Sequence, residues 1–147
     1  MAQMGRFLLS TTAANLALNA ITKRLDGGSV RIYSGPRPGA PDTSPDTRNQ
    51  LLVEFALVTP SFEPADAREA IGRPFRDPAG AQIRIDGEAS WVRFVAADGE
   101  AVLDGDAGTM PTRADAPAPL VVLPVSRLQA GVSVQVLGMR LRLPLAA

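Results

Sequence analysis

The chain has 147 residues, a formal net charge of zero, and neither cysteine nor histidine. This composition excludes disulfides and thiolate metal sites, and it lacks the side chain that most often serves as general base or zinc ligand. The balanced charge argues against a nucleic-acid partner, the absence of a run of about 18 apolar residues argues against a membrane span, and the length suggests one domain.

One helix is predicted, over residues 11–25, TTAANLALNAITKRL. Its apolar residues recur at helical spacing, and Thr11 or Thr12 can cap the free N–H groups at its start. Asp26-Gly27-Gly28 ends the helix, because glycine adopts the left-handed conformation of a helix cap. The apolar stripe is thin, so we expect this helix to lie against a partner or a sheet edge.

From Ser29 onward apolar and polar residues alternate, a pattern typical of half-buried β-strands. Strands are predicted at residues 29–33, 51–58, 82–86, 89–96, 100–104, 120–125, 132–136 and 139–143. Asp98-Gly99 is a hairpin signal between two of them, and residues 105–108 are expected to turn the chain again. About eight strands after one short N-terminal helix favour an all-β fold, a β-sandwich or jelly roll. We expect a single domain overall, with residues 1–28 as N-terminal arm and helix and residues 29–147 as the sandwich.

Four acids, Asp98, Glu100, Asp104 and Asp106, cluster around the predicted hairpin. Calcium binds several such oxygens, but this spacing matches no calcium loop, and aspartate often flanks glycine in ordinary tight turns. A carboxylate pair for glycoside hydrolysis is a further interpretation of Asp104 and Asp106, but no other feature suggests a substrate cleft. We therefore favour ordinary turn residues as the interpretation of these four acids. The sequence has no phosphate loop or nucleophile elbow, and it predicts no enzyme, no metal site and no cofactor.

Trp91 and Tyr33 are the single tryptophan and the single tyrosine of the chain. If they were exposed, their rings would stack on sugars, and the protein would be a carbohydrate-binding β-sandwich module. On its predicted strand Trp91 shares a face with Arg93 and Val95. We therefore favour a core or inter-sheet position for the tryptophan ring.

A long polar loop, Ser34 to Arg48, separates two predicted strands and contains four prolines. Proline reduces the entropy that a loop loses when it is ordered on a partner. We therefore predict that this loop contacts an adjacent subunit, with Arg37, Pro38, Pro41 and Arg48 as candidate partner-binding residues. An ordinary solvated loop is the alternative.

Two further candidates, Arg140 and Arg142, alternate with leucines near the C-terminus. They form either a solvated strand face or a sheet edge that meets acidic groups of a neighbour. All but one of the 15 basic residues are arginine, the exception being Lys23. Arginine is enriched at protein interfaces, although a GC-rich genome would produce the same bias.

Several segments together resemble a family of small structural proteins of tailed phages. The resemblance lies in residues 30–35, VRIYSG, the proline-rich loop, 51–57, LLVEFAL, 87–95, GEASWVRFV, 97–99, ADG, 102–108, VLDGDAG, and 128–134, LQAGVSV. These motifs are strand–turn–strand units, and the resemblance covers about residues 20–138.

This resemblance implies a cement or decoration protein with a jelly-roll fold on the outside of the capsid. Its expected function is to stabilise the shell of major capsid proteins, without enzymatic activity. The expected partners are the major capsid protein and further copies of the chain, as a dimer or trimer, but neither nucleic acid nor membrane. The expected location is the virion, assembled in the cytoplasm of the bacterial host. A neck, tail or baseplate component of the same particle is the alternative.

Overall fold

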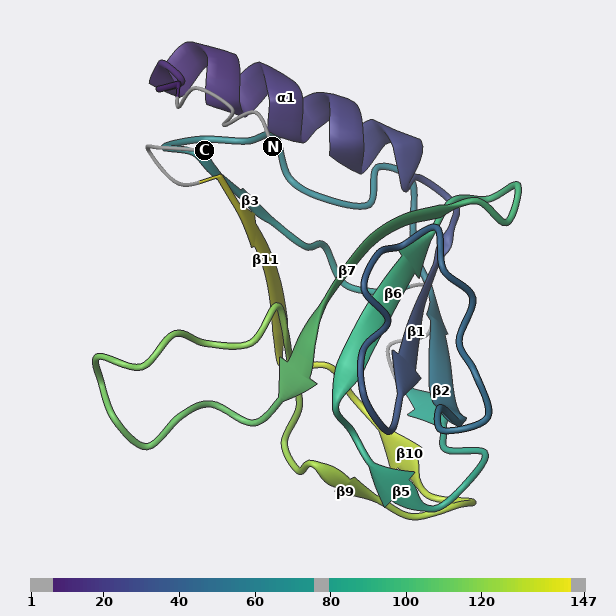
Figure 1. Ribbon diagram of the computed structural model, residues 1–147. Coiled ribbons are helices and arrows are strands. Elements are labelled where there is room, and N and C mark those ends of the chain that lie inside the picture. Colours follow the sequence, from purple (N-terminus) through teal and green to yellow (C-terminus); the bar gives the residue numbers. More distant parts are fainter. Residues whose placement is uncertain (1–6, 76–79, 144–147) are drawn as a thin grey trace, which may run out of the picture.

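The computed structural model describes residues 7–75 and 80–143 (Figure 1). The protein is mostly β, with one short helix, as predicted. The described residues form α1 (Thr11–Arg24) and the strands β1 (Ser29–Tyr33), β2 (Leu51–Ala56), β3 (Glu69–Ile71), β4 (Ala81–Gln82), β5 (Gly87–Glu88), β6 (Trp91–Val95), β7 (Ala101–Gly108), β8 (Val121–Val122), β9 (Arg127–Leu128), β10 (Ser133–Val134) and β11 (Gly138–Arg142). Five of these strands contain only two residues, so much of the chain runs in loops between short pairings.

One seven-stranded mixed sheet organises the molecule, in the order β2-β1-β6-β7-β8-β11-β3. Its neighbours are antiparallel except β7 and β8, which pair in parallel through only two residue pairs. After this short junction β11 and β3 diverge from β7 and run toward α1 (Figure 1). Two small sheets, β10-β4 and β5-β9, complete a β-sandwich with a jelly-roll-like, all-β architecture.

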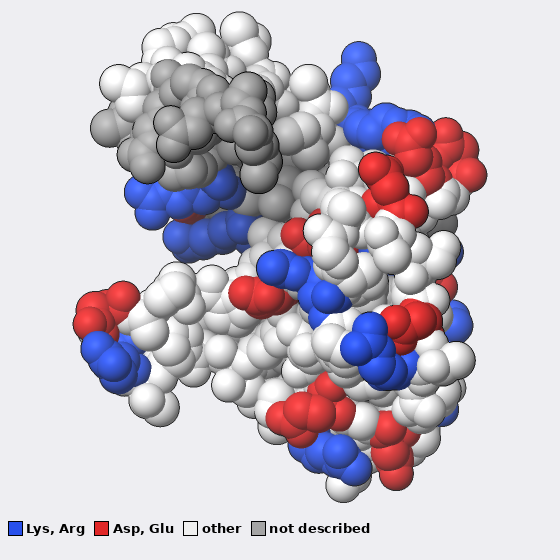
Figure 2. All heavy atoms as spheres, viewed as in Figure 1, with Lys and Arg blue, Asp and Glu red and all other residues white. Residues whose placement is uncertain are grey.

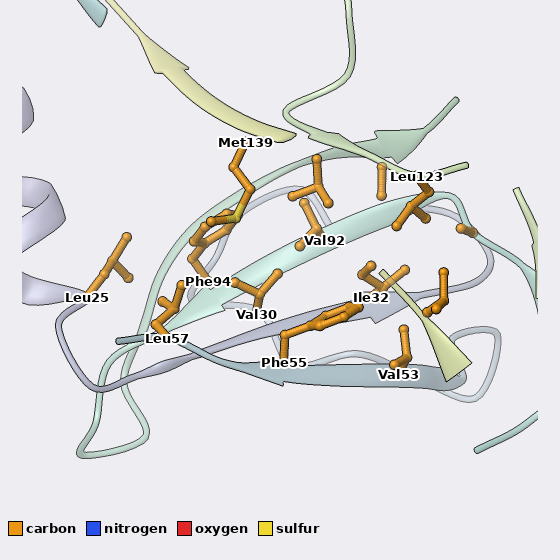
Figure 3. Packing of buried hydrophobic residues seen from close by; sticks show 14 of the residues in the cluster. Leu25, Val30, Ile32, Val53, Phe55, Leu57, Val92, Phe94, Leu123 and Met139 are labelled. Atoms are coloured by element: carbon orange, nitrogen blue, oxygen red, sulfur yellow. The ribbon is translucent and has the colours of Figure 1, made fainter. Parts of the chain in front are cut away.

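The core lies on one face of the strands β1, β2 and β6 (Figure 3). Successive side chains of a strand point to opposite faces, which places alternate apolar residues inside. The inward residues of these strands include Val30, Ile32, Val53, Phe55, Val92 and Phe94. Leu25 from the end of α1, Leu123 after β8 and Met139 from β11 close the same core. Distant segments therefore share one apolar cluster.

α1 begins at Thr11, as predicted, but its capping residue lies before the predicted ones. Ser10 caps the helix, and its Oγ accepts a hydrogen bond from Ala13 N at 3.0 Å, so the prediction of Thr11 or Thr12 as the cap was wrong. Ser10 has the extended backbone that a capping residue requires, whereas both threonines are already helical. At the other end Gly27 has a φ of 72°, which confirms the predicted glycine stop.

α1 docks on its own chain, beside the edge strand β3. Ala14 and Leu18 belong to the apolar stripe of the helix and are buried. Asn15 Oδ1 accepts from Arg68 N at 2.9 Å, and Asn19 Oδ1 accepts from Ala65 N at 2.8 Å. The thin stripe is thus supplemented by polar side chains that bind the backbone of the segment before β3.

That segment contains a strained two-residue turn. Asp66 and Glu69 exchange backbone hydrogen bonds of 2.9 Å, and both residues between them have positive φ, 49° at Ala67 and 68° at Arg68. Asparagine adopts this conformation more readily than alanine. We expect Ala67→Asn to raise the free energy of unfolding by about 0.5–1 kcal/mol in urea titrations. Ala114→Asn, at an exposed position without positive φ, is the control, and equal effects of both variants would contradict the argument.

Residues 105–108 continue β7, and the predicted turn there was wrong. Gly105 is glycine because of close packing: an added Cβ would lie 2.4 Å from Leu120 Cδ2. Ala107 and Gly108 pair with β8. The strand predicted at 82–86 shrinks to two residues, and β3 lies in a segment for which no strand was predicted.

Candidate interaction surface

The second face of the main sheet carries a row of charged side chains. Register aligns Glu54 of β2, Arg31 of β1, Arg93 of β6 and Asp104 of β7. Arg93 Nε and Nη2 donate to the two carboxylate oxygens of Asp104 at 2.8 and 3.0 Å, and each side chain is only 6% exposed. Arg31 Nε donates to Glu54 Oε2 at 2.8 Å. Two oppositely charged pairs therefore cross four strands of the sheet.

Two aromatic rings lie on this face beside the charged row. The Tyr33 and Trp91 rings stack with centroids 4.5 Å apart, and the Arg93 guanidinium carbon lies 5.2 Å from the Trp91 centroid. Trp91 is 1% exposed and Tyr33 7%. The prediction that Trp91 is buried is confirmed, although its ring lies outside the main core cluster, and neither ring offers the exposed surface that sugar stacking requires.

The proline-rich loop, residues 34–50, folds over this second face. Arg93 Nη2 donates to Ala40 O at 3.4 Å, and Asn49 Nδ2 donates to Ser34 O and Pro36 O at 3.0 and 2.8 Å. A cavity of about 370 Å³ remains beneath the loop, lined among others by Arg31, Arg93, Pro41 and Pro45. The loop is thus anchored on its own sheet along its inner side, while most of its other residues stay exposed.

The four candidate residues of the loop differ in orientation. Pro38 and Pro41 are half-buried. Arg37 is exposed and pairs with Asp106 at 3.4 Å between Nη1 and Oδ1. Arg48 is exposed and pairs with Asp46 at 2.8 Å, and its hydrogen bonds hold the pKa of the Asp46 carboxyl below its usual value. Both arginines are therefore exposed, but Arg37 reaches strand β7 of its own sheet, whereas the partner of Arg48 lies within the loop.

Arg140 and Arg142 lie on the exposed side of β11, away from the loop (Figure 1). Arg140 Nη1 is 3.2 Å from Glu69 Oε1 on the neighbouring edge strand β3. The structure does not join these residues to the loop candidates, so the sequence named two separate surfaces. Figure 2 shows acidic and basic side chains interspersed over the visible face, without an extended patch of one sign.

The acids near the hairpin are paired with arginines. Asp98 and Glu100 lie 2.8 and 3.3 Å from Arg24 Nη2, while Asp104 and Asp106 pair with Arg93 and Arg37. Asp98 Oδ1 also accepts from Glu100 N at 3.0 Å, which confirms its role in the turn. Within residues 7–75 and 80–143, no group of three or more acids is arranged to hold a metal ion.

Glu54 makes the charged row sensitive to acid. Burial raises the pKa of Glu54, but hydrogen bonds from Arg31 and Ser29 and the charges of Arg31 and Arg84 together lower it more, so its pKa lies below the ordinary value of about 4.3. Its carboxylate thus stabilises the fold above that pH, and the contribution is lost as the pH falls through the folded-state pKa. We expect the free energy of unfolding to fall less steeply between pH 7 and pH 3 in Glu54→Gln. Parallel curves for the variant and the wild type would contradict this role.

The sequence did not predict one apolar groove of the structure. Val125, Val132 and Leu137 are exposed and line a groove of about 640 Å³. Val132 was predicted to begin a strand over residues 132–136, but β10 contains only Ser133 and Val134, and of the two valines only Val134 is buried. Exposed apolar residues beside a short strand resemble buried ones in sequence, so no local signal distinguishes them.

Comparisons with protein-family models, curated proteins and solved structures found no match to this chain. Among the described residues, none of the helical structure is long and apolar enough to cross a membrane.

Proposed function

We propose that this chain is a non-enzymatic structural protein of a tailed-phage particle. It binds the outside of the capsid and stabilises the shell of major capsid proteins. The proposal rests first on the resemblance of the motifs at residues 30–57 and 87–108, which include β1, β2, β6 and β7, four neighbouring strands of the main sheet, and β5 of a small sheet. These segments carry the sheet that supports the loop.

The anchored loop is the observation that carries this proposal. Hydrogen bonds from Arg93 and Asn49 hold its backbone in place, and Arg37 and Arg48 remain exposed on it. A loop that is ordered before binding loses little entropy when it meets a partner. Such a rigid, exposed segment suits lasting contact with a neighbouring capsid subunit.

The proposed partners are the major capsid protein and other copies of this chain, in a dimer or trimer. Joining several copies makes later contacts intramolecular, so weak individual contacts add up to firm attachment. The proposed location is the surface of the virion, after assembly in the bacterial cytoplasm.

Copy number in purified particles tests this function. Quantitative mass spectrometry would compare this chain with the major capsid protein. A ratio near one to one, or a simple fraction of it, supports shell decoration. A handful of copies per particle would move the protein to the neck, tail or baseplate, and complete absence would overturn the structural role.

Charge reversal separates the two candidate surfaces. We expect Arg37→Glu combined with Arg48→Glu to reduce the occupancy of particles at least tenfold, because both side chains are exposed on the loop. Arg140→Glu combined with Arg142→Glu is the matched test of β11, and Lys23→Glu is the control at another exposed base. Unchanged occupancy in the first variant would remove the loop from the interface.

A further inference from the structure

Exposed apolar side chains gather around the groove described above. Val125, Val132 and Leu137 are 52%, 51% and 64% exposed. Among the described residues that line this groove, none is acidic, and Arg127 is the one basic side chain. Soluble monomers seldom expose several large apolar side chains side by side, so this groove has the character of an interaction site.

A second unusual feature is the segment between β7 and β8, residues 109–120, which projects from the body (Figure 1). We call this segment the arm. Among the described residues, the hydrogen bonds of residues 109–119 stay within the arm: Ala116 N donates to Arg113 O at 3.3 Å, and Arg113 Nη2 donates to Asp115 Oδ2 at 2.9 Å. Met110 is 59% exposed. The arm therefore gains little stability from its own body.

We propose that the arm of one copy lies in the groove of a second copy. Residues 116–119, Ala-Pro-Ala-Pro, favour an extended conformation about 12 Å long, which docks on apolar surfaces at a low entropic cost. Asp115 precedes this stretch, and its charge is opposite to that of Arg127 in the groove. In the arm Asp115 pairs with Arg113 at 2.9 Å, and docking exchanges this exposed ion pair for one with Arg127. The apolar stretch matches the apolar wall, and the pair of Asp115 with Arg127 fixes the direction of the arm.

The contact joins two different patches of the same chain. Such a contact closes a dimer by reciprocal exchange of arms, or a ring when each copy passes its arm to the next. The inference rests on the homo-oligomer in the proposed function. Its test needs no phage particle, so a failure of the contact between copies is distinguishable from a failure of the proposed capsid function.

The experiment uses two variants that each disable one half of the contact. Val132→Arg with Leu137→Arg places charge in the groove and leaves the arm intact. Asp115→Arg with Ala118→Arg alters the arm and leaves the groove intact. Both introduce positive charge, so the variants gain no new attraction for each other. Light scattering after size-exclusion chromatography gives the mass, and thermal unfolding shows that each variant is folded.

We expect the wild type to be an oligomer, each variant alone to be a monomer, and an equimolar mixture to form a 1:1 heterodimer. Only an intact arm in an intact groove produces that heterodimer. Leu8→Arg with Leu16→Arg, two exposed leucines outside the groove, is the control and should remain an oligomer. A monomeric wild type or a mixture without heterodimer would overturn the inference. A monomer that still decorates particles would assign the groove to another virion protein.

Discussion

Replacing Arg93 by alanine is expected to lower the free energy of unfolding by about 3–5 kcal/mol. The substitution leaves the Asp104 carboxylate in a site where its side chain is only 6% exposed and without its bidentate partner. It also removes the donor that holds Ala40 O, so the loop should loosen. Urea titration measures the loss of stability, and tryptophan fluorescence reports the exposure of Trp91.

Two further variants test whether the loss of stability comes from the uncompensated charge of Asp104. Arg93→Met with Asp104→Leu removes both charges and should recover most of the lost stability, because apolar residues of similar volume replace buried ion pairs at little cost. Arg84→Ala, whose side chain is 56% exposed, should cost less than about 1 kcal/mol. Equal losses in Arg93→Ala and in the double variant would refute the role assigned to the uncompensated carboxylate.

Gly28→Ala is expected to destabilise the protein by about 3 kcal/mol, at the upper end of the range for overpacking. Gly28 joins α1 to β1, and a Cβ built there would lie 2.0 Å from the backbone oxygen of Val95 in β6. Backbone cannot rotate out of the way as a side chain does, so the link between helix and sheet must shift. Gly39→Ala is the matched control, since no atom lies within 4 Å of its Cβ, and thermal unfolding compares the two. An unaffected Gly28→Ala would show that the linker adapts freely.

The alternating strands and the hairpin could be predicted because their signals are local. Residues 30–32 show the two-residue period of a strand, residues 91–95 are dense in β-branched and aromatic residues, and Asp98-Gly99 supplies the turn. Gly99 has a φ of 94°, which glycine adopts at no steric cost. A continuous sequence stretch is enough to specify such elements.

Features that depend on distant residues could not be predicted. Gly105 was predicted to lie in a turn. The space at this position is limited by the side chain of Leu120, which is distant in sequence, so the neighbouring residues gave no sign of it. The anchoring of the loop needs Arg93, which is far from Ala40 in sequence. The loop arginines, Arg37 and Arg48, are exposed, but sequence alone did not show that the loop is fastened to its own sheet.

The order of strands in the main sheet has a consequence for how the protein folds. The β6–β7 hairpin joins strands that are close in sequence, whereas β1 must pair with β6 across a long intervening chain, Ser29 with Val95. β11, the last described strand, pairs with both β8 and β3. The seven-stranded sheet therefore depends on pairings between segments that are distant in sequence, and such pairings form more slowly than a local hairpin.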